Sequence, residues 1–221
     1  MNAGLLADLG LTFRLDVTPR WERLLVLLHG YGATQHDIMA MSSHVDPTGR
    51  FAVVAPRGPV EVPGMGASWY DFDQQWVADP VSFHATLNTL NVFVDGVCEA
   101  FGADRSDVVI GGFSQGAGMA AWLSFATASS APAGFWCCGT IVDVEGKQLD
   151  LSRANGTRCL VLAGRSDPNV PLARSRDQAR LLDLAGSEVT LSEHDGGHGL
   201  SQLMLDDMHA WLAMFQPPLD K

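Results

Sequence analysis

An α/β domain with a mostly parallel central sheet and helices on both faces is the fold class that this 221-residue sequence predicts. Short apolar segments rich in β-branched residues alternate with helix-length segments, which is typical of strand–helix–strand units. Several strand candidates are apolar throughout, as expected of strands covered on both faces. No repeat, low-complexity tract or charged linker divides the chain, so residues 1–221 are expected to form a single domain.

The strand candidates are spaced so that helices can connect them. They are 11–17, 24–28, 51–55, 107–111, 134–142, 158–163 and 187–192. The helix candidates are 34–41, 82–101, 115–128, 171–184 and 201–215. This alternation predicts right-handed crossovers, and it gathers reactive groups at the carboxyl ends of the strands.

Composition and charge exclude several classes of partner. A hydrophobic content of 47% with 18% charged residues is ordinary for a compact protein and unlike a disordered one. The formal net charge of −11 argues against nucleic acid and anionic membrane surfaces, because both attract basic patches. The longest apolar runs, such as 24–28, are too short to span a bilayer, so we expect no stable membrane insertion.

The N-terminus and the cysteines favour a reducing, cytoplasmic setting. Residues 1–10 have no basic flank and no long apolar stretch, so they do not resemble a signal peptide. Four cysteines are irregularly spaced and form neither a disulfide framework nor a metal-binding pattern. We expect buried or half-buried free thiols at Cys98, Cys137, Cys138 and Cys159.

A candidate nucleophile, Ser114, lies where a buried strand runs through a G-x-S-x-G motif into a helix of small residues. Such a serine stands on a sharp turn, so Gly112 and Gly116 are needed where side chains would collide with neighbouring backbone. The turn also places Ser114 at a helix N-terminus, where N–H groups favour developing negative charge. The three-letter motif alone is a weak signal, but its flanking strand and helix favour a nucleophile over a plain glycine-rich turn.

A serine needs a base to remove its proton. In a fold of this kind the chain order is nucleophile, acid, histidine, which leaves His194, His198 and His209. His198 is the expected base, because its glycine-rich loop between the last strand and the last helix lets the ring reach across the sheet. His194 is the main rival. The glycines between His194 and His198 disfavour the helix that a zinc site with this spacing would need, so we expect no metal. We also expect no cofactor.

The acid that orients the base must follow a strand and precede His198. Asp167 does so, in a turn that Pro168 stiffens. A simple turn-forming role is the structural alternative for Asp167. The rival acids are Asp143, Asp150 and Asp195. Asp143 follows an earlier strand, Asp150 lies in a connecting loop, and Asp195 is too close in sequence to His198 for easy pairing.

Acyl transfer develops charge on a carbonyl oxygen, which pre-aimed N–H donors stabilise. One donor is expected from the residue after the nucleophile, Gln115, and the second from Tyr31, in the loop after an early strand. Gly30 and Gly32 free the backbone on either side of Tyr31. The alternative is a glycine turn without a catalytic role. His29 is expected to be structural, since a base there would break the chain order.

The segment 56–80 does not fit the strand–helix scheme. Loops this long inside a compact domain are usually functional or disordered, and its aromatic residues make disorder the poorer choice. We predict that its large apolar side chains form one wall of an acyl pocket. These side chains are Met65, Trp69, Phe72 and Trp76. The alternative is that these side chains pack a secondary core or cover a homodimer contact.

Taken together, these segments resemble the phospholipase/carboxylesterase family of α/β-hydrolases, which includes bacterial carboxylesterases and acyl-protein thioesterases. The resemblance covers the chain from about Leu24 onwards. It rests on motifs in the family order, which are LHGYG at 28–32, APRGP at 55–59, SWYD at 68–71, GFSQG at 112–116, DP at 167–168 and GHG at 197–199.

The resemblance implies hydrolysis of small or medium acyl esters or thioesters, with Trp69 beside the acyl pocket. It implies a triad and two amide donors, formed by Ser114, Asp167 and His198 and by Tyr31 and Gln115. The sequence departs from the family pattern at Tyr31, Ala117 and Asn169, without removing a catalytic group. Two other hypotheses stay open, a non-catalytic binding module with the hydrolase fold and a lyase or acyltransferase using the same triad.

Overall fold

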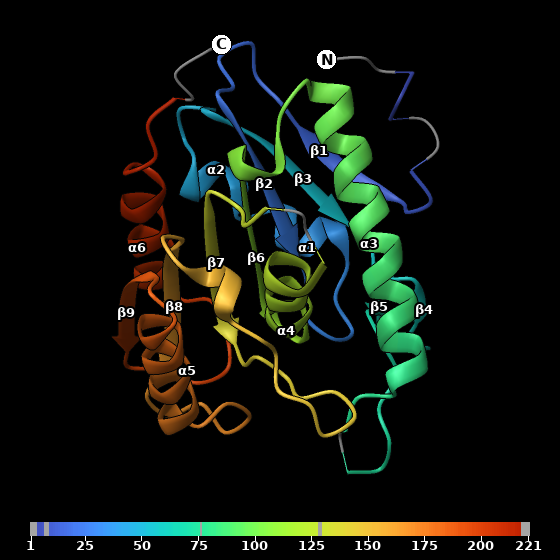
Figure 1. The fold of residues 1–221 in the computed structure, drawn as a ribbon, viewed down its shortest axis with the longest axis vertical. Coiled ribbons are helices and arrows are strands. Elements are labelled where there is room, and N and C mark those ends of the chain that lie inside the picture. The colour runs from blue at the N-terminus through green and yellow to red at the C-terminus, as the bar shows by residue number, and fades with distance from the viewer. Residues whose placement is uncertain (1–3, 7–8, 76, 128–129, 218–221) are drawn as a thin grey trace.

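The computed structural model describes residues 4–6, 9–75, 77–127 and 130–217. A seven-stranded sheet crosses the molecule in the order β1-β3-β2-β6-β7-β8-β9 (Figure 1). Its strands are β1 (Phe13–Asp16), β2 (Arg23–Leu28), β3 (Phe51–Pro56), β6 (Val108–Ser114), β7 (Gly134–Gly139), β8 (Arg158–Gly164) and β9 (Glu188–His194). β1 pairs antiparallel with β3, and every other pairing is parallel. The predicted mostly parallel sheet is confirmed.

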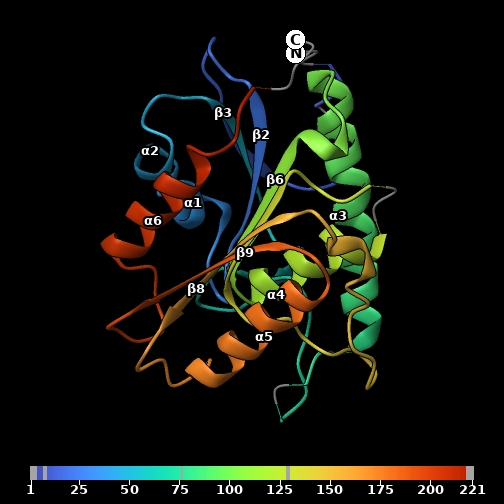
Figure 2. The same ribbon diagram turned by 60° about the vertical axis from the view of Figure 1, so that its left-hand side comes forward.

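Helices cover both faces of this sheet (Figure 2). One face carries α3 (Pro80–Phe101), α4 (Gln115–Trp122) and α5 (Leu172–Leu184). The other carries α1 (Gln35–Met39), α2 (Ser42–Val45) and α6 (Gln202–Leu212). Short helical turns also occur at η1 (Arg105–Asp107), η2 (Leu123–Thr127) and η3 (Ser152–Ala154).

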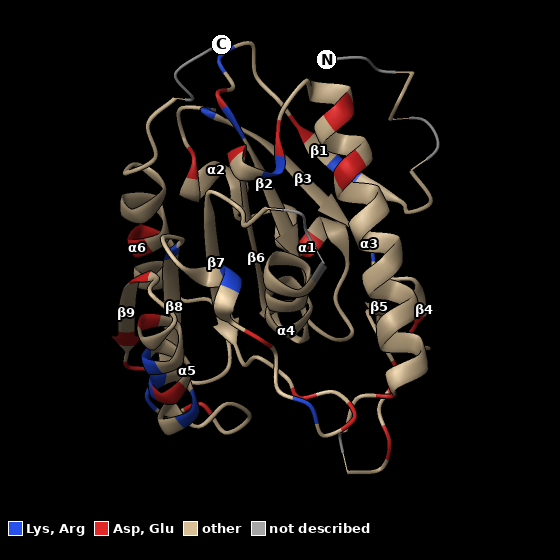
Figure 3. Cartoon of the chain, viewed as in Figure 1, with Lys and Arg blue, Asp and Glu red and all other residues tan. Residues whose placement is uncertain are grey.

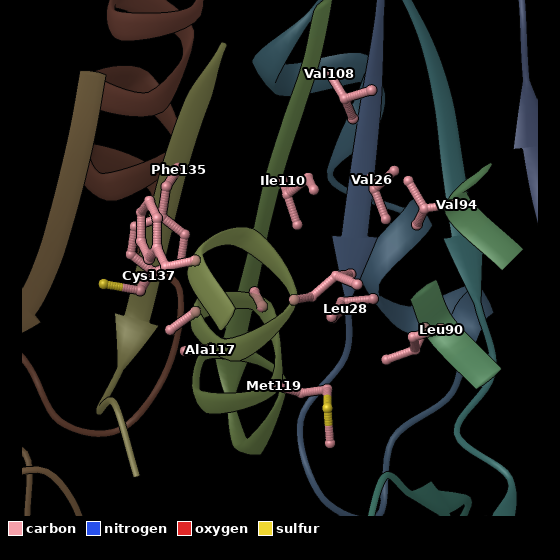
Figure 4. Packing of buried hydrophobic residues seen from close by; sticks show 14 of the residues in the cluster. Val26, Leu28, Leu90, Val94, Val108, Ile110, Ala117, Met119, Phe135 and Cys137 are labelled. Carbon is pink, nitrogen blue, oxygen red and sulfur yellow. The ribbon is translucent and has the colours of Figure 1, made fainter. Parts of the chain in front are cut away.

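Alternate side chains of the central strands enter two different cores. In β2, Val26 and Leu28 pack with α3 and α4, whereas Leu25 and Leu27 pack with α1, α2 and α6. Figure 4 shows Leu90 and Val94 of α3 facing Val26 and Leu28. Burial on both faces explains why β2 is apolar from Leu24 to Leu28, and this packing supports the carboxyl ends of the central strands.

The largest helix begins two residues earlier than the sequence indicated. The Asp79 carboxylate accepts a 2.8 Å hydrogen bond from the Ser82 amide, and Pro80 occupies the first helical position, where its missing N–H costs nothing. Gly102 ends the helix in the left-handed conformation, at φ 63°. The observed α4 is shorter than the helix predicted over 115–128. It ends at Trp122, and the wider helical turn η2 follows it.

The segment 56–80 is ordered around a small hairpin, β4 (Val60–Glu61) and β5 (Ala67–Ser68). An antiparallel bridge joins Ala67 to Ala33, which ties this hairpin to the loop after β2. The four cysteines are free and buried. Within the described ranges, no helix is long and apolar enough to cross a membrane.

Candidate active site

Ser114 stands on a strained turn between β6 and α4, with φ 53° and ψ −117°. A Cβ on Gly112 would lie 2.4 Å from the backbone of Gly116, and a Cβ on Gly116 would lie 2.3 Å from the Leu28 carbonyl oxygen. Glycine is therefore required at both positions, because β6, α4 and β2 approach too closely for side chains. This packing holds the turn against its strain and presents the Ser114 hydroxyl at the edge of the sheet.

A chain of two hydrogen bonds links Ser114, His198 and Asp167. The Ser114 Oγ lies 2.8 Å from His198 Nε2, and His198 Nδ1 lies 2.8 Å from Asp167 Oδ2. An ionised carboxylate can only accept, so Nδ1–H donates to Asp167 and a neutral ring leaves Nε2 to accept the serine proton. The side chains of His198 and Asp167 are 18% and 7% exposed, which shields both hydrogen bonds from bulk water.

The Asp167 carboxylate is stabilised in its ionised form. Burial alone would raise its pKa, but hydrogen bonds from the Val170 and Asn169 amides and from the His198 ring outweigh burial and hold the pKa below its ordinary value. The two amides bind Oδ1 at 2.9 and 2.8 Å, which leaves Oδ2 for the histidine. Asp167 therefore fixes both the tautomer and the direction of the ring.

The rival histidines have other partners. His194 Nε2 hydrogen-bonds Asp207 at 2.7 Å and Ser192 at 2.9 Å, between β9 and α6. His209 Nδ1 contacts the Val45 carbonyl at 3.0 Å. Among the rival acids, Asp195 pairs with Arg165 at 2.9 Å and is 94% exposed, and Asp150 accepts a hydrogen bond from the Ser152 amide. The structure thus brings His198 and Asp167, and not these residues, to Ser114.

The loop after β2 passes close to Ser114. A Cβ on Gly30 would lie 3.3 Å from the Cβ of Ser114. The Gly32 amide donates to the Ala67 carbonyl at 2.9 Å, so the hairpin holds this loop in place. Gln115 is the first residue of α4, where a backbone N–H has no acceptor within the helix. Tyr31 and Gln115 therefore lie next to Ser114, and their role as amide donors stays a prediction.

A sequence profile described as Phospholipase/Carboxylesterase matches residues 18–216. The chain belongs to the phospholipase/carboxylesterase family. MhqD of Bacillus subtilis (strain 168), which is named as a hydrolase, is 27% identical over 190 residues, covering 86% of this chain and 92% of MhqD. The resemblance inferred from the motifs is confirmed.

Two crystal structures show the same fold. A carboxylesterase of Bacillus cereus is 26% identical with a TM-score of 0.81, over 96% of this chain and 98% of that one. Esterase PE8 is 25% identical with a TM-score of 0.81, over 93% of this chain and 99% of that one. This member of the phospholipase/carboxylesterase family has the α/β-hydrolase fold and is an esterase-type hydrolase.

A cavity of about 610 Å³ opens at Ser114 in this family member. It is lined by Tyr31, Tyr70, Phe72, Ser114, Gln115, Thr140, Val142, Pro168, Asn169, Val170, Arg174 and His198. Most lining residues outside the triad follow the carboxyl ends of strands, so that position was the signal that could have found them. Across the described part of the chain, no three His, Cys, Asp or Glu side chains are grouped as metal ligands.

The residues predicted to form a pocket wall differ in their position relative to the cleft. Phe72 lines the cleft and packs edge-on against the Tyr31 ring, with centroids 5.9 Å apart. Met65 is not among the residues that line the cleft. Its side chain is 66% exposed and lies against Gly32. Trp76 lies outside the described residues.

Trp69 is a supporting residue and not a lining one. It is 0% exposed, its indole N–H donates a 2.7 Å hydrogen bond to the His29 carbonyl, and its ring lies 4.7 Å from the His29 ring. The His29 ring accepts from the Gly58 amide through Nε2 at 3.0 Å and bonds the Gly30 carbonyl through Nδ1 at 2.8 Å. Burial lowers the pKa of His29, which keeps this ring neutral. Trp69 and His29 together fix the loop beneath the cleft.

The side chain of Gln115 has a role that sequence reasoning missed. Its Oε1 accepts from the Trp69 amide at 3.0 Å, and its Nε2 donates to the Tyr70 carbonyl at 2.9 Å and to Ser68 Oγ at 2.9 Å. Gln115, the residue after Ser114, therefore anchors the cleft wall to α4. No local pattern indicates this contact, because the partners lie more than 40 residues apart.

Proposed function

We propose that this protein hydrolyses carboxylic esters or thioesters through an acyl-enzyme intermediate on Ser114. The observation that carries the proposal is the chain of 2.8 Å hydrogen bonds from Ser114 through His198 to Asp167. A serine so connected can lose its proton to the ring as it attacks a carbonyl carbon.

In the first half of the reaction, Ser114 Oγ attacks the substrate carbonyl while His198 Nε2 takes the hydroxyl proton. The resulting oxyanion is stabilised by the backbone N–H groups of Gln115 and Tyr31. His198 then returns the proton to the departing alcohol or thiol, which leaves the acyl group on Ser114. Asp167 stabilises the imidazolium that exists between these two proton transfers.

In the second half, water replaces the alcohol. His198 takes a proton from water, the hydroxide attacks the acyl-enzyme, and the proton returns to Ser114 as the carboxylic acid leaves. A cleft of about 610 Å³ is within the usual range for small-molecule sites, which favours small or medium acyl groups.

The test is hydrolysis of p-nitrophenyl esters and acyl-CoA thioesters across chain lengths. We expect wild-type turnover, a loss of several orders of magnitude in kcat for Ser114→Ala, and a loss of about 10⁴-fold for Asp167→Asn. A wild-type protein that binds these substrates without turning them over would instead indicate a binding module. Transfer of the acyl group to an alcohol in preference to water would indicate an acyltransferase.

A further inference from the structure

Helix α5 carries three arginines and two aspartates next to the cleft. Figure 3 shows basic residues gathered on this helix, which carries Arg174, Arg176 and Arg180. Arg176 is neutralised by Glu193, with a bidentate pair at 2.6 and 2.9 Å. Arg174, on the first turn, lines the same cavity as Ser114 and His198. Within the described ranges its guanidinium makes no ion pair and no side-chain hydrogen bond.

Arg174 sets the charge of the cleft. None of the residues that line the cavity carries a carboxylate, and Arg174 is the one arginine or lysine among them. A cation without a partner at the mouth of a catalytic cleft stands out in a chain whose formal net charge is −11. An arginine presents several N–H donors in a planar fork that matches a carboxylate with two parallel hydrogen bonds.

The surroundings of Arg174 limit where an anion can bind. Arg174 and Thr140 also border a neighbouring groove of about 490 Å³, and that groove carries Asp143 and Asp177. Those two carboxylates repel an anion on the groove side, whereas no carboxylate lines the cleft side. A single cation also matches one carboxylate better than a phosphate dianion, which usually needs several positive or N–H donors.

We infer that Arg174 selects ester substrates that carry a carboxylate group. This inference rests on the proposed esterase activity at Ser114. The carboxylate can belong to the acyl part, as in a half-ester of a dicarboxylic acid, or to the alcohol part, as in an ester of a hydroxy acid. Both bring the same anion to Arg174 while the ester carbonyl lies at Ser114.

Two matched substrate pairs test the inference. The acyl pair is p-nitrophenyl hydrogen glutarate and p-nitrophenyl pentanoate, and the alcohol pair is the butyrate ester of 4-hydroxybenzoate and phenyl butyrate. For at least one pair, Arg174→Gln should lower kcat/KM for the anionic member by about 10-fold to 100-fold, as expected for a lost charged hydrogen bond. The neutral member should change less than about 3-fold.

Arg180→Gln is the matched control, because Arg180 is an exposed arginine on the same helix that does not line the cleft. It should leave both members of each pair unchanged. Arg174→Lys should keep part of the preference, since it keeps the charge and loses the planar fork. The wild-type preference for the anionic member should also shrink as salt is raised from about 0.01 M to 1 M.

A binding measurement separates this inference from the proposed catalysis. Calorimetry should detect binding of the hydrogen glutarate ester or the hydroxybenzoate ester to the Ser114→Ala protein. The double variant Ser114→Ala/Arg174→Gln should bind the same ester at least about 10-fold more weakly. Equal effects of Arg174→Gln on anionic and neutral members of both pairs would overturn the role of Arg174. Absence of turnover with every ester, with Arg174-dependent binding retained, would overturn the esterase proposal alone.

Discussion

The backbone N–H of Ser166 donates a 2.9 Å hydrogen bond to the carbonyl of Gly196. The Arg165 amide makes a second bond, of 2.8 Å, to the His194 carbonyl. The loop that carries Asp167 and the loop that carries His198 are therefore joined by their backbones. This junction holds Asp167 next to His198.

The closeness of these loops gives a first prediction. A Cβ on Gly164 would lie 2.5 Å from the Gly197 carbonyl oxygen, so Gly164→Ala should force the loops apart. A displacement of about 1 Å costs on the order of 100-fold in rate, and we expect kcat to fall by about 10-fold to 100-fold. Gly199→Ala is the control, since a Cβ there meets nothing within 4 Å. Steady-state kinetics of the two variants should differ accordingly, and equal kcat values would contradict the junction's role.

The strain at Ser114 gives a second prediction. Both Ser114→Ala and Ser114→Gly remove the hydroxyl, but Ser114→Gly also relieves the positive φ of 53°. We expect both variants to be inactive and Ser114→Gly to be more stable than Ser114→Ala by about 1 kcal/mol. Denaturant unfolding of the two proteins measures the difference. If Ser114→Ala were the more stable variant, the turn would not be strained.

Trp69 and Phe72 should respond differently to truncation. Trp69 is fully buried against His29, so Trp69→Ala should lower the free energy of unfolding by about 3–5 kcal/mol. Because Trp69 does not line the cleft, the relative kcat/KM values for C2 to C12 esters should keep their order. Phe72→Ala should change that order at a smaller cost in stability, since Phe72 does line the cleft. Melting temperatures and chain-length profiles of both variants check this, and a Trp69→Ala profile that changes shape would be the contrary outcome.

We predict that Asp207 makes a pH-dependent contribution to the stability of the folded protein. The Ser192 hydroxyl foremost, and then the His194 ring, hold the pKa of Asp207 below its ordinary value. A lowered pKa in the folded state means that the contribution is complete above the unfolded value of about 3.9 and is lost as the pH falls through the folded value. The melting-temperature difference between wild type and Asp207→Asn should thus be largest above about pH 5 and shrink below about pH 4. Asp206→Asn, on the exposed side of α6, is the control. A difference that stays constant with pH would show that the carboxylate is not stabilised in this way.

The sequence predicted the features that leave a local signature. Glycines at 112 and 116 mark the turn at Ser114, and the strand ends before Asp167 and His198 place these residues at one edge of the sheet. Their chain order removed the earlier histidines, and the glycine-rich loop around His198 and the strand end before Asp167 favoured these two residues over the remaining rivals. The structure brings the three side chains together, and their catalytic roles stay predictions.

The missed features depend on contacts between distant segments. An aromatic-rich loop indicates burial, but it does not say which rings face the cleft, and Trp69 is fully buried beneath it. The hydrogen bonds from Gln115 to the backbone of Trp69 and Tyr70 join segments whose packing no periodicity encodes. In the sequence Arg174 is one of several charged residues in a helical segment, and only the folded chain places it in the same cavity as Ser114.

Covalent labelling of Ser114 tests the central claim most directly. A fluorophosphonate reacts with a serine that a neighbouring base activates. Intact-mass and peptide-mass measurements should find one adduct, on Ser114, in the wild-type protein. Ser114→Ala should not be labelled, and His198→Ala should be labelled far more slowly although its serine is present. An adduct on another residue, or labelling of Ser114→Ala at the wild-type rate, would contradict the account.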